Sequence, residues 1–175
     1  MQNKQNKQDN NEQSSYDLYS KTLRFNTLAG KLAHVTMQDV LNQEKRITEE
    51  YKEFIFSLQN GNAVGALDGL IDMLVTCHGA LQQMQVLGCD VQGAMQAVAE
   101  DNLSKFPTNA GVAYKTRDYY AEQGINVTVQ QADGCFVIKD ENQKVRKPFG
   151  YRPLDLSQFV SERAVQEFAE FAGKA

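Results

Sequence analysis

The chain has 175 residues, a formal net charge of −4 at pH 7 and a hydrophobic content of 42%. This length fits one domain, or one domain with an appendage, and the composition is typical of a soluble globular protein. A sequence pI near 5.2 argues against a nucleic-acid-binding surface, but it leaves nucleotide binding through a metal ion open.

The cysteines and the absence of targeting signals predict a cytoplasmic protein. Cys77, Cys89 and Cys135 are odd in number and form no C-x-x-C pair, so we interpret them as free thiols in a reducing compartment. No apolar run approaches the length of a membrane span, and the N-terminus lacks a signal-peptide core. We therefore expect no membrane partner.

The N-terminal part of the chain is predicted to be a polar tail followed by a helical bundle. Residues 1–15 are nearly all polar and cannot bury enough apolar surface to offset the entropy of ordering, so we expect disorder. A short amphipathic helix over residues 16–30 should end at Gly30. Residues 16–106 are expected to form the catalytic bundle.

A capping box of Thr36 and Asp39 predicts where the second helix begins. Its expected buried stripe consists of Val40, Ile47, Tyr51, Phe54, Ile55 and Leu58. The turn at residues 59–62 should lead into a third helix that extends to about Leu87.

Three glycines in the third helix, at positions 65, 69 and 79, each cost about 1 kcal/mol relative to Ala, which suggests close helix approach and a self-associating face. We interpret His78 as a hydrogen-bonded core or interface histidine rather than a ligand.

The remaining segments complete a mainly α fold. A fourth helix begins at Asp90, with Val91, Met95, Val98 and Leu103 toward the core. Four helices with short connections predict a four-helix bundle. Residues 107–175 should form an appendage of a short helix, a β-hairpin, an extended segment and an amphipathic closing helix.

Two carboxylate pairs are predicted to face each other across the helical hairpin. Glu50 and Glu53 are three residues apart, and Asp68 and Asp72 are four apart, so each pair shares a helix face. Oxygen ligands without Cys or His suit Mg²⁺, with Mn²⁺ as a substitute. The simpler alternative is that these acids face water. Against it, both aspartates lie in the most apolar helix, where an ionised Asp is rarely buried without a partner.

The order of these motifs resembles the all-α nucleoside triphosphate pyrophosphohydrolases, which include MazG and the dimeric dUTPases. The motifs are E-E-x-x-E, a hairpin turn, the acidic run LDGLID, NLSK and KVRKPFGYRPLDL, and the resemblance covers roughly Phe25 to Leu156. The chain is most similar to the phosphoribosyl-ATP pyrophosphohydrolase-like branch. The resemblance implies Mg²⁺-dependent cleavage of a nucleoside triphosphate, expected to be a deoxynucleotide, to the monophosphate and pyrophosphate.

The resemblance also assigns expected roles to residues. Glu49 matches the position that orients or deprotonates the attacking water, whereas Glu50, Glu53 and Asp72 match metal ligands. Where the family has Glu in E-x-x-D, this chain has Gly69, and the nearby acid is Asp68. The residues expected to contact substrate are Asn102, Lys105, Lys147, Tyr151 and Asn26.

Two alternatives stay open from the sequence. One is a non-catalytic nucleotide-binding or adaptor bundle, which the replacement of the usual Glu by Asp68 would favour. The other is a phosphoribosyl-ATP pyrophosphohydrolase of histidine synthesis, although the segments after Pro107 argue against it. The glycine-bearing helix and the resemblance both favour a homodimer or homotetramer.

Overall fold

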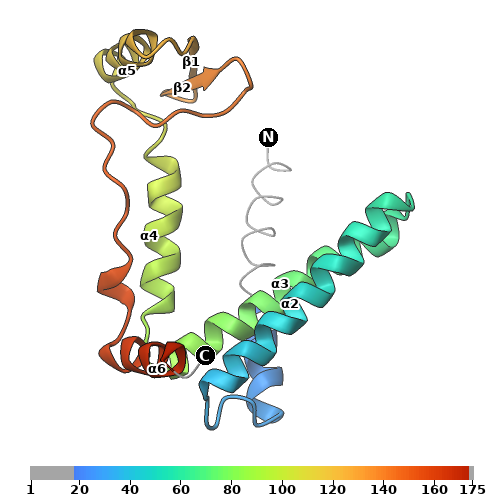
Figure 1. Ribbon diagram of the computed structural model, residues 1–175. Coiled ribbons are helices and arrows are strands. Elements are labelled where there is room, and N and C mark those ends of the chain that lie inside the picture. The colour runs from blue at the N-terminus through green and yellow to red at the C-terminus, as the bar shows by residue number, and fades with distance from the viewer. Residues whose placement is uncertain (1–17, 174–175) are drawn as a thin grey trace, which may run out of the picture. The chain divides into compact units, whose positions relative to one another are not determined.

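The computed structural model describes residues 18–173, and the tail expected to be disordered lies outside this range. The described chain is mainly helical and carries one small antiparallel sheet (Figure 1). A helix over residues 18–28 comes first. The further elements are α2 (Met37–Gln59), α3 (Ala63–Val86), α4 (Val91–Leu103), α5 (Ala110–Glu122), β1 (Val127–Ala132), β2 (Cys135–Asp140), the short 3-10 helix η1 (Ser157–Phe159) and α6 (Glu162–Ala172).

The chain divides into two compact units. Unit 1 contains residues 1–91 and 159–175, and unit 2 contains residues 92–158. This division differs from the boundary after residue 106 drawn from the sequence, because the closing helix α6 packs with the N-terminal helices. Since most of α4 belongs to unit 2, the expected four-helix bundle is not confirmed.

The α2–α3 hairpin is the main element of unit 1. Thr36 and Asp39 form the predicted capping box at the start of α2, and Asn62 caps α3 by accepting a hydrogen bond from Gly65 N at 3.0 Å. Three glycines of α3 each lie against one residue of α2. The pairs are Gly65 with Ser57, Gly69 with Phe54 and Gly79 with Gln43.

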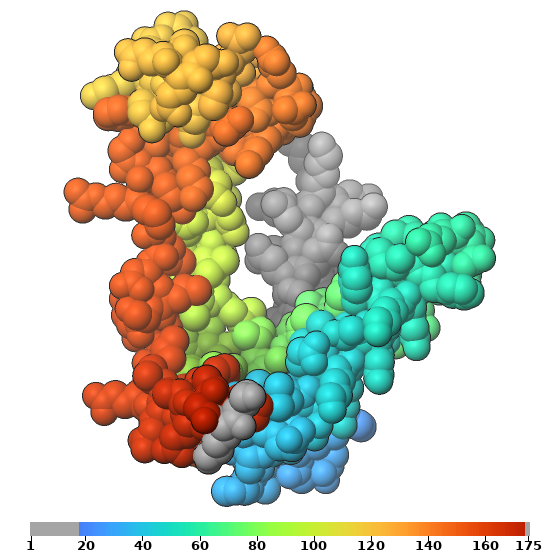
Figure 2. Space-filling model, in the orientation of Figure 1, coloured from blue at the N-terminus to red at the C-terminus, as the bar shows by residue number. Residues whose placement is uncertain are grey.

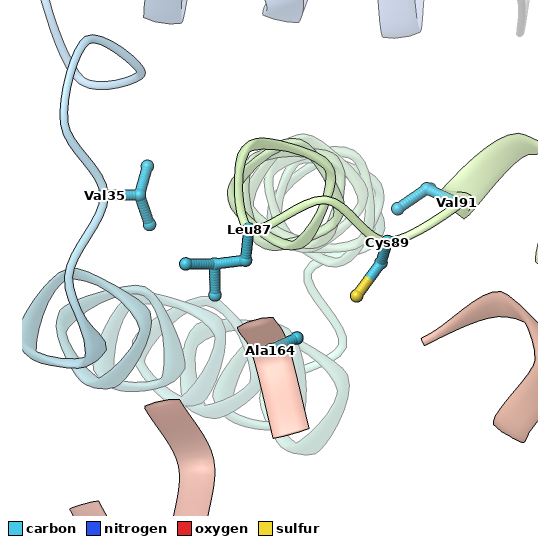
Figure 3. Close-up of a cluster of buried hydrophobic side chains, with 5 residues drawn as sticks. All are labelled: Val35, Leu87, Cys89, Val91 and Ala164. Carbon is cyan, nitrogen blue, oxygen red and sulfur yellow. The ribbon is translucent and has the colours of Figure 1, made fainter. Parts of the chain in front are cut away.

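A small apolar core joins α6 to the end of the hairpin where α2 begins and α3 ends. Leu87 and Ala164 are fully buried, next to Val35, Cys89 and Val91 (Figure 3). Ser161 fixes the start of α6 here, because its Oγ donates to Leu87 O at 2.7 Å and accepts from Ala164 N at 3.0 Å. At the other end of the hairpin, near the turn between α2 and α3, neither the helix over residues 18–28 nor α6 covers it (Figure 2).

Unit 2 is built around the predicted β-hairpin. β1 and β2 pair antiparallel from Val127 opposite Asp140 to Ala132 opposite Cys135. Asp133 and Gly134 make the turn with positive φ angles of 47° and 77°, as a two-residue hairpin turn requires. The fully buried Ile138 lies on β2. The hairpin is joined to the preceding segment by a hydrogen bond from Phe136 N to Pro107 O at 2.8 Å.

The expected apolar faces are less buried than the periodicity predicted. In α2, Tyr51 and Leu58 are 52% and 54% exposed, and in α4 Met95, Val98 and Leu103 are also exposed, whereas Val91 is buried as predicted. The predicted burial is therefore wrong for these exposed residues.

The helix α3 also corrects the expectation that no apolar run reaches the length of a membrane span. Among residues 18–173 it is the one helix long and apolar enough to cross a membrane by length and composition. Its many apolar residues, interrupted by Asp68 and Asp72 alone as charged groups, explain this result. One such helix is weak support for a span, because core helices of soluble proteins meet the same criteria.

Candidate functional site

The register of the hairpin places Glu50 close to the level of Asp72. Phe54 lies against Gly69, and Gln43 lies against Gly79. Counting along the two antiparallel helices from the first contact places Glu50 opposite Met73, and counting from the second contact places it opposite Asp72. Glu50 and Asp72 therefore lie within about one residue of the same level of the hairpin.

The pKa of Glu50 reflects the other four predicted acids. The pKa of the half-buried Glu50 is raised, first by burial and then by the negative charges of Asp72, Glu53, Glu49 and Asp68, in that order. Within residues 18–173, no cation is among the causes of this shift. The cluster is thus a concentration of negative charge that a divalent cation would relieve.

The structure explains why the chain lacks a glutamate at position 69. A Cβ there would lie 2.9 Å from Phe54 N and 3.1 Å from Phe54 Cα. Backbone atoms cannot give way as a flexible side chain does, so the close approach of α2 and α3 requires Gly69. The acid of this turn is displaced to Asp68, which is exposed.

The acids are not arranged as a complete set of metal ligands. Among the described residues, no group of three or more His, Cys, Asp or Glu side chains is arranged to hold a metal ion. Glu49, Glu53, Asp68 and Asp72 are all exposed, so their side chains are free to turn. The donor set is entirely carboxylate oxygen, which fits Mg²⁺ or Mn²⁺.

Asn26, expected at the base of the substrate, lies in unit 1, as the acids do. It is only 7% exposed, and its Nδ2 donates to Gln82 Oε1 at 2.8 Å. It lines an open pocket of about 150 Å³ between the helix over residues 18–28, α2 and α3. Asn26 therefore has a structural hydrogen bond and also faces a space that a ligand can enter.

The four other residues expected to contact substrate lie in unit 2, where they form one connected group. Lys105 Nζ donates to Asn102 Oδ1 at 2.6 Å. Tyr151 OH lies 2.7 Å and 2.8 Å from the two carboxylate oxygens of Asp101, the residue next to Asn102. The Nζ of Lys147 lies 4.4 Å from the centre of the Tyr151 ring. The late segment is thus tied to the end of α4.

Asp101 is a member of this group that the sequence reasoning missed. Its carboxylate accepts the Tyr151 hydroxyl hydrogen bond, which raises the pKa of Tyr151 above its ordinary value. One signal was available in the sequence, because an acid near a helix C-terminus is opposed by the helix dipole and needs a compensating partner.

His78 is buried, as predicted. It is 7% exposed, and its Nδ1 has no partner among the described residues. Its ring meets that of Tyr19 edge to face, with the centroids 5.1 Å apart. Burial lowers the pKa of His78, so the neutral imidazole packs as an aromatic group and not as a charged one.

Comparisons of this chain with protein-family models, with curated proteins and with solved structures give no match. The resemblance to the all-α pyrophosphohydrolases therefore stays a prediction from the ordered motifs.

Proposed function

We propose that the protein hydrolyses a nucleoside triphosphate, with a deoxynucleotide as the expected substrate, to the monophosphate and pyrophosphate in the presence of Mg²⁺. The observation that supports this proposal is that Glu50 and Asp72 lie near each other across the α2–α3 hairpin, with three further carboxylates close enough to raise the Glu50 pKa. A triphosphate is a polyanion, so a carboxylate cluster can bind it only through bridging cations.

Glu50, Glu53, Asp68 and Asp72 would hold the ion, which when bound neutralises the phosphates and acidifies a water molecule. Glu49 is exposed beside this set and accepts the proton of the attacking water. The water oxygen forms a bond to the α-phosphorus as the bond to the bridging oxygen of the β-phosphate breaks. Pyrophosphate then leaves with the electron pair of that bond.

Substrate contacts beyond the acids are expected at Asn102, Lys105, Lys147 and Tyr151. The ammonium groups of Lys105 and Lys147 suit the negative charge that develops on a leaving pyrophosphate. The Asn102 amide and the Tyr151 hydroxyl can add hydrogen bonds. Their mutual contacts in unit 2 support their action as one group. We propose that this group contacts phosphate oxygens of the triphosphate.

A homo-oligomer, either a dimer or a tetramer, is part of the proposal. Leu67, Leu70, Ile71 and Leu74 follow helical spacing on α3 and are each more than 40% exposed. The charged residues of α3 and the polar helix α2 beside it make lipid an unfavourable environment for this hairpin. We propose that the hairpin of a second copy of the chain packs on these exposed residues of α3.

The test is a panel of nucleotides incubated with the full chain and Mg²⁺, with detection of pyrophosphate. Pyrophosphate should be the first product, and Glu53→Gln and Asp72→Asn should each abolish its release. Glu44→Gln is the matched control, since Glu44 is an exposed acid of α2 outside the cluster. Orthophosphate as the first product would contradict the proposal.

The second candidate is a non-catalytic nucleotide-binding or adaptor protein. The finding that favours it is that no three acids of the described chain are arranged around a metal position. Titration with Mn²⁺, followed by electron paramagnetic resonance, separates the two candidates. Saturable binding that Asp72→Asn removes supports the hydrolase, whereas no binding supports the adaptor.

A further inference from the structure

The pocket that contains Asn26 has cations and no acids in its lining. Lys31 and Arg46 both line it, and none of its lining residues is Asp or Glu. Arg46 lies four residues before Glu50 on α2, and thus about 6 Å along the helix axis from it. The pocket is therefore one helical turn from the acid cluster and has the opposite charge.

The two cations lie close to each other, and no described carboxylate pairs with either. Burial lowers the pKa of Lys31, and the positive charge of Arg46 lowers it further. In the described part of the chain neither residue has a carboxylate within ion-pair distance. Lys31 Nζ lies 4.9 Å from the centre of the Phe25 ring, and Arg46 donates a long hydrogen bond of 3.4 Å to Gln43 Oε1. Two like charges in one small pocket repel each other unless an anion lies between them.

The polar wall of the pocket is held in place by its own hydrogen bonds. Gln43 is 6% exposed and donates through Nε2 to Thr76 O at 2.7 Å. Thr22 is 5% exposed and donates to Leu18 O at 2.8 Å. A Cβ at Gly79 would lie 2.9 Å from Gln43 Nε2, so the glycine leaves room for this amide. The polar groups of the wall are thus held by short hydrogen bonds, whereas Lys31 and Arg46 have only a cation–π contact and one long hydrogen bond.

We propose that this pocket is an anion subsite that takes a phosphoryl group through Lys31 and Arg46 without a metal ion. Arg presents a planar fork of donors that matches phosphate oxygens, and Lys adds a compact charge. A pocket of about 150 Å³ admits one phosphoryl group with its bound water. The phosphoryl group has two possible sources, a phosphate of the nucleotide or free phosphate or pyrophosphate, and the first of these rests on the proposed function.

The test measures binding of inorganic phosphate and pyrophosphate to the full chain in EDTA by isothermal titration calorimetry. Saturable binding is expected, and Lys31→Gln and Arg46→Gln should each weaken it about tenfold or more. Arg46→Lys should recover part of the affinity. Lys52→Gln is the matched control, because Lys52 is an exposed cation of α2 that does not line the pocket, and its affinity should equal that of the wild type.

A second set of titrations identifies the source. A nucleoside monophosphate that competes with pyrophosphate, while the parent nucleoside does not, assigns the subsite to a nucleotide phosphate. Competition by phosphate and pyrophosphate alone assigns it to the free anion. The melting temperature of each variant without ligand shows that the variant is folded.

Two results would overturn the subsite. One is the absence of saturable binding in EDTA at millimolar phosphate and pyrophosphate. The other is equal affinity in wild type, Lys31→Gln and Arg46→Gln. Failure of the proposed function gives a different result. A chain that binds pyrophosphate in EDTA but releases no pyrophosphate from any nucleotide would support the anion subsite and contradict the hydrolase.

Discussion

Gly69 of α3 lies so close to Phe54 of α2 that a Cβ at position 69 would be 2.9 Å from the Phe54 backbone nitrogen. This contact sets the spacing of the hairpin and thereby the distance across which the acids of the two helices face each other. The contact also explains why the acid lies at position 68 and not at position 69, where the E-x-x-D motif would place it, because position 69 has no room for a side chain.

Gly69→Ala should destabilise the protein. Ala normally stabilises a helix interior by about 1 kcal/mol relative to Gly, but overpacking against backbone costs about 1–3 kcal/mol. We expect a lower free energy of unfolding in denaturant titrations. Asp68→Ala, at the exposed neighbouring position, should not lower it when measured in EDTA. A rise in stability for Gly69→Ala would contradict the close contact.

Glu50→Gln should stabilise the metal-free protein and remove its response to Mg²⁺. The raised pKa of Glu50 means that its carboxylate is unfavourable in the fold at neutral pH, so a neutral amide relieves repulsion. Thermal unfolding with EDTA and with Mg²⁺ measures both effects. The wild type should gain stability with Mg²⁺, by mass action, and Glu50→Gln should not. Glu44→Gln should behave as the wild type.

Leu67→Glu and Leu74→Glu should dissociate the proposed oligomer. Each places a charge on an apolar face of α3 that is 63% and 41% exposed at these positions, and burial of an unpaired charge in an interface is costly. Sedimentation velocity should show a fall to the 19.6 kDa mass of one chain. Leu28→Glu, at an apolar residue that is 78% exposed outside the hairpin, is the control. A wild type that sediments as a monomer would contradict the interface.

Asp140→Asn should make unit 2 less stable at neutral pH and less sensitive to acid. Hydrogen bonds from Lys144 N and the charge of Arg146, 2.7 Å away, lower the pKa of Asp140. A lowered pKa in the fold contributes stability above the unfolded value near about 4, and this contribution is lost as pH falls through the folded pKa.

For Asp140→Asn we therefore expect a lower melting temperature at pH 7 and a smaller decrease between about pH 5 and pH 2. The exposed turn residue Asp133, changed to Asn, is the control, since Asn also tolerates its positive φ. An unchanged melting temperature at pH 7 for Asp140→Asn would contradict a stabilising ion pair with Arg146.

The helices and the hairpin could be predicted from the sequence because their signals are local. Thr36 and Asp39 predicted the start of α2, and the Ala-Asp-Gly turn predicted the β-hairpin. Both predictions are confirmed. The neighbourhood of Glu50 and Asp72 was also predictable, since a short turn forces two helices to run side by side.

The tertiary structure alone decided which surfaces are covered and which distant residues meet. Periodicity marks an apolar face but cannot say what covers it, so Leu58 and Val98 were expected inside and lie exposed. The hydrogen bond between Tyr151 and Asp101 joins residues far apart in the chain, and Lys31 and Arg46 meet in one pocket with residues of α3. Such contacts depend on how whole segments fold back on one another, and no local pattern of residues encodes that path.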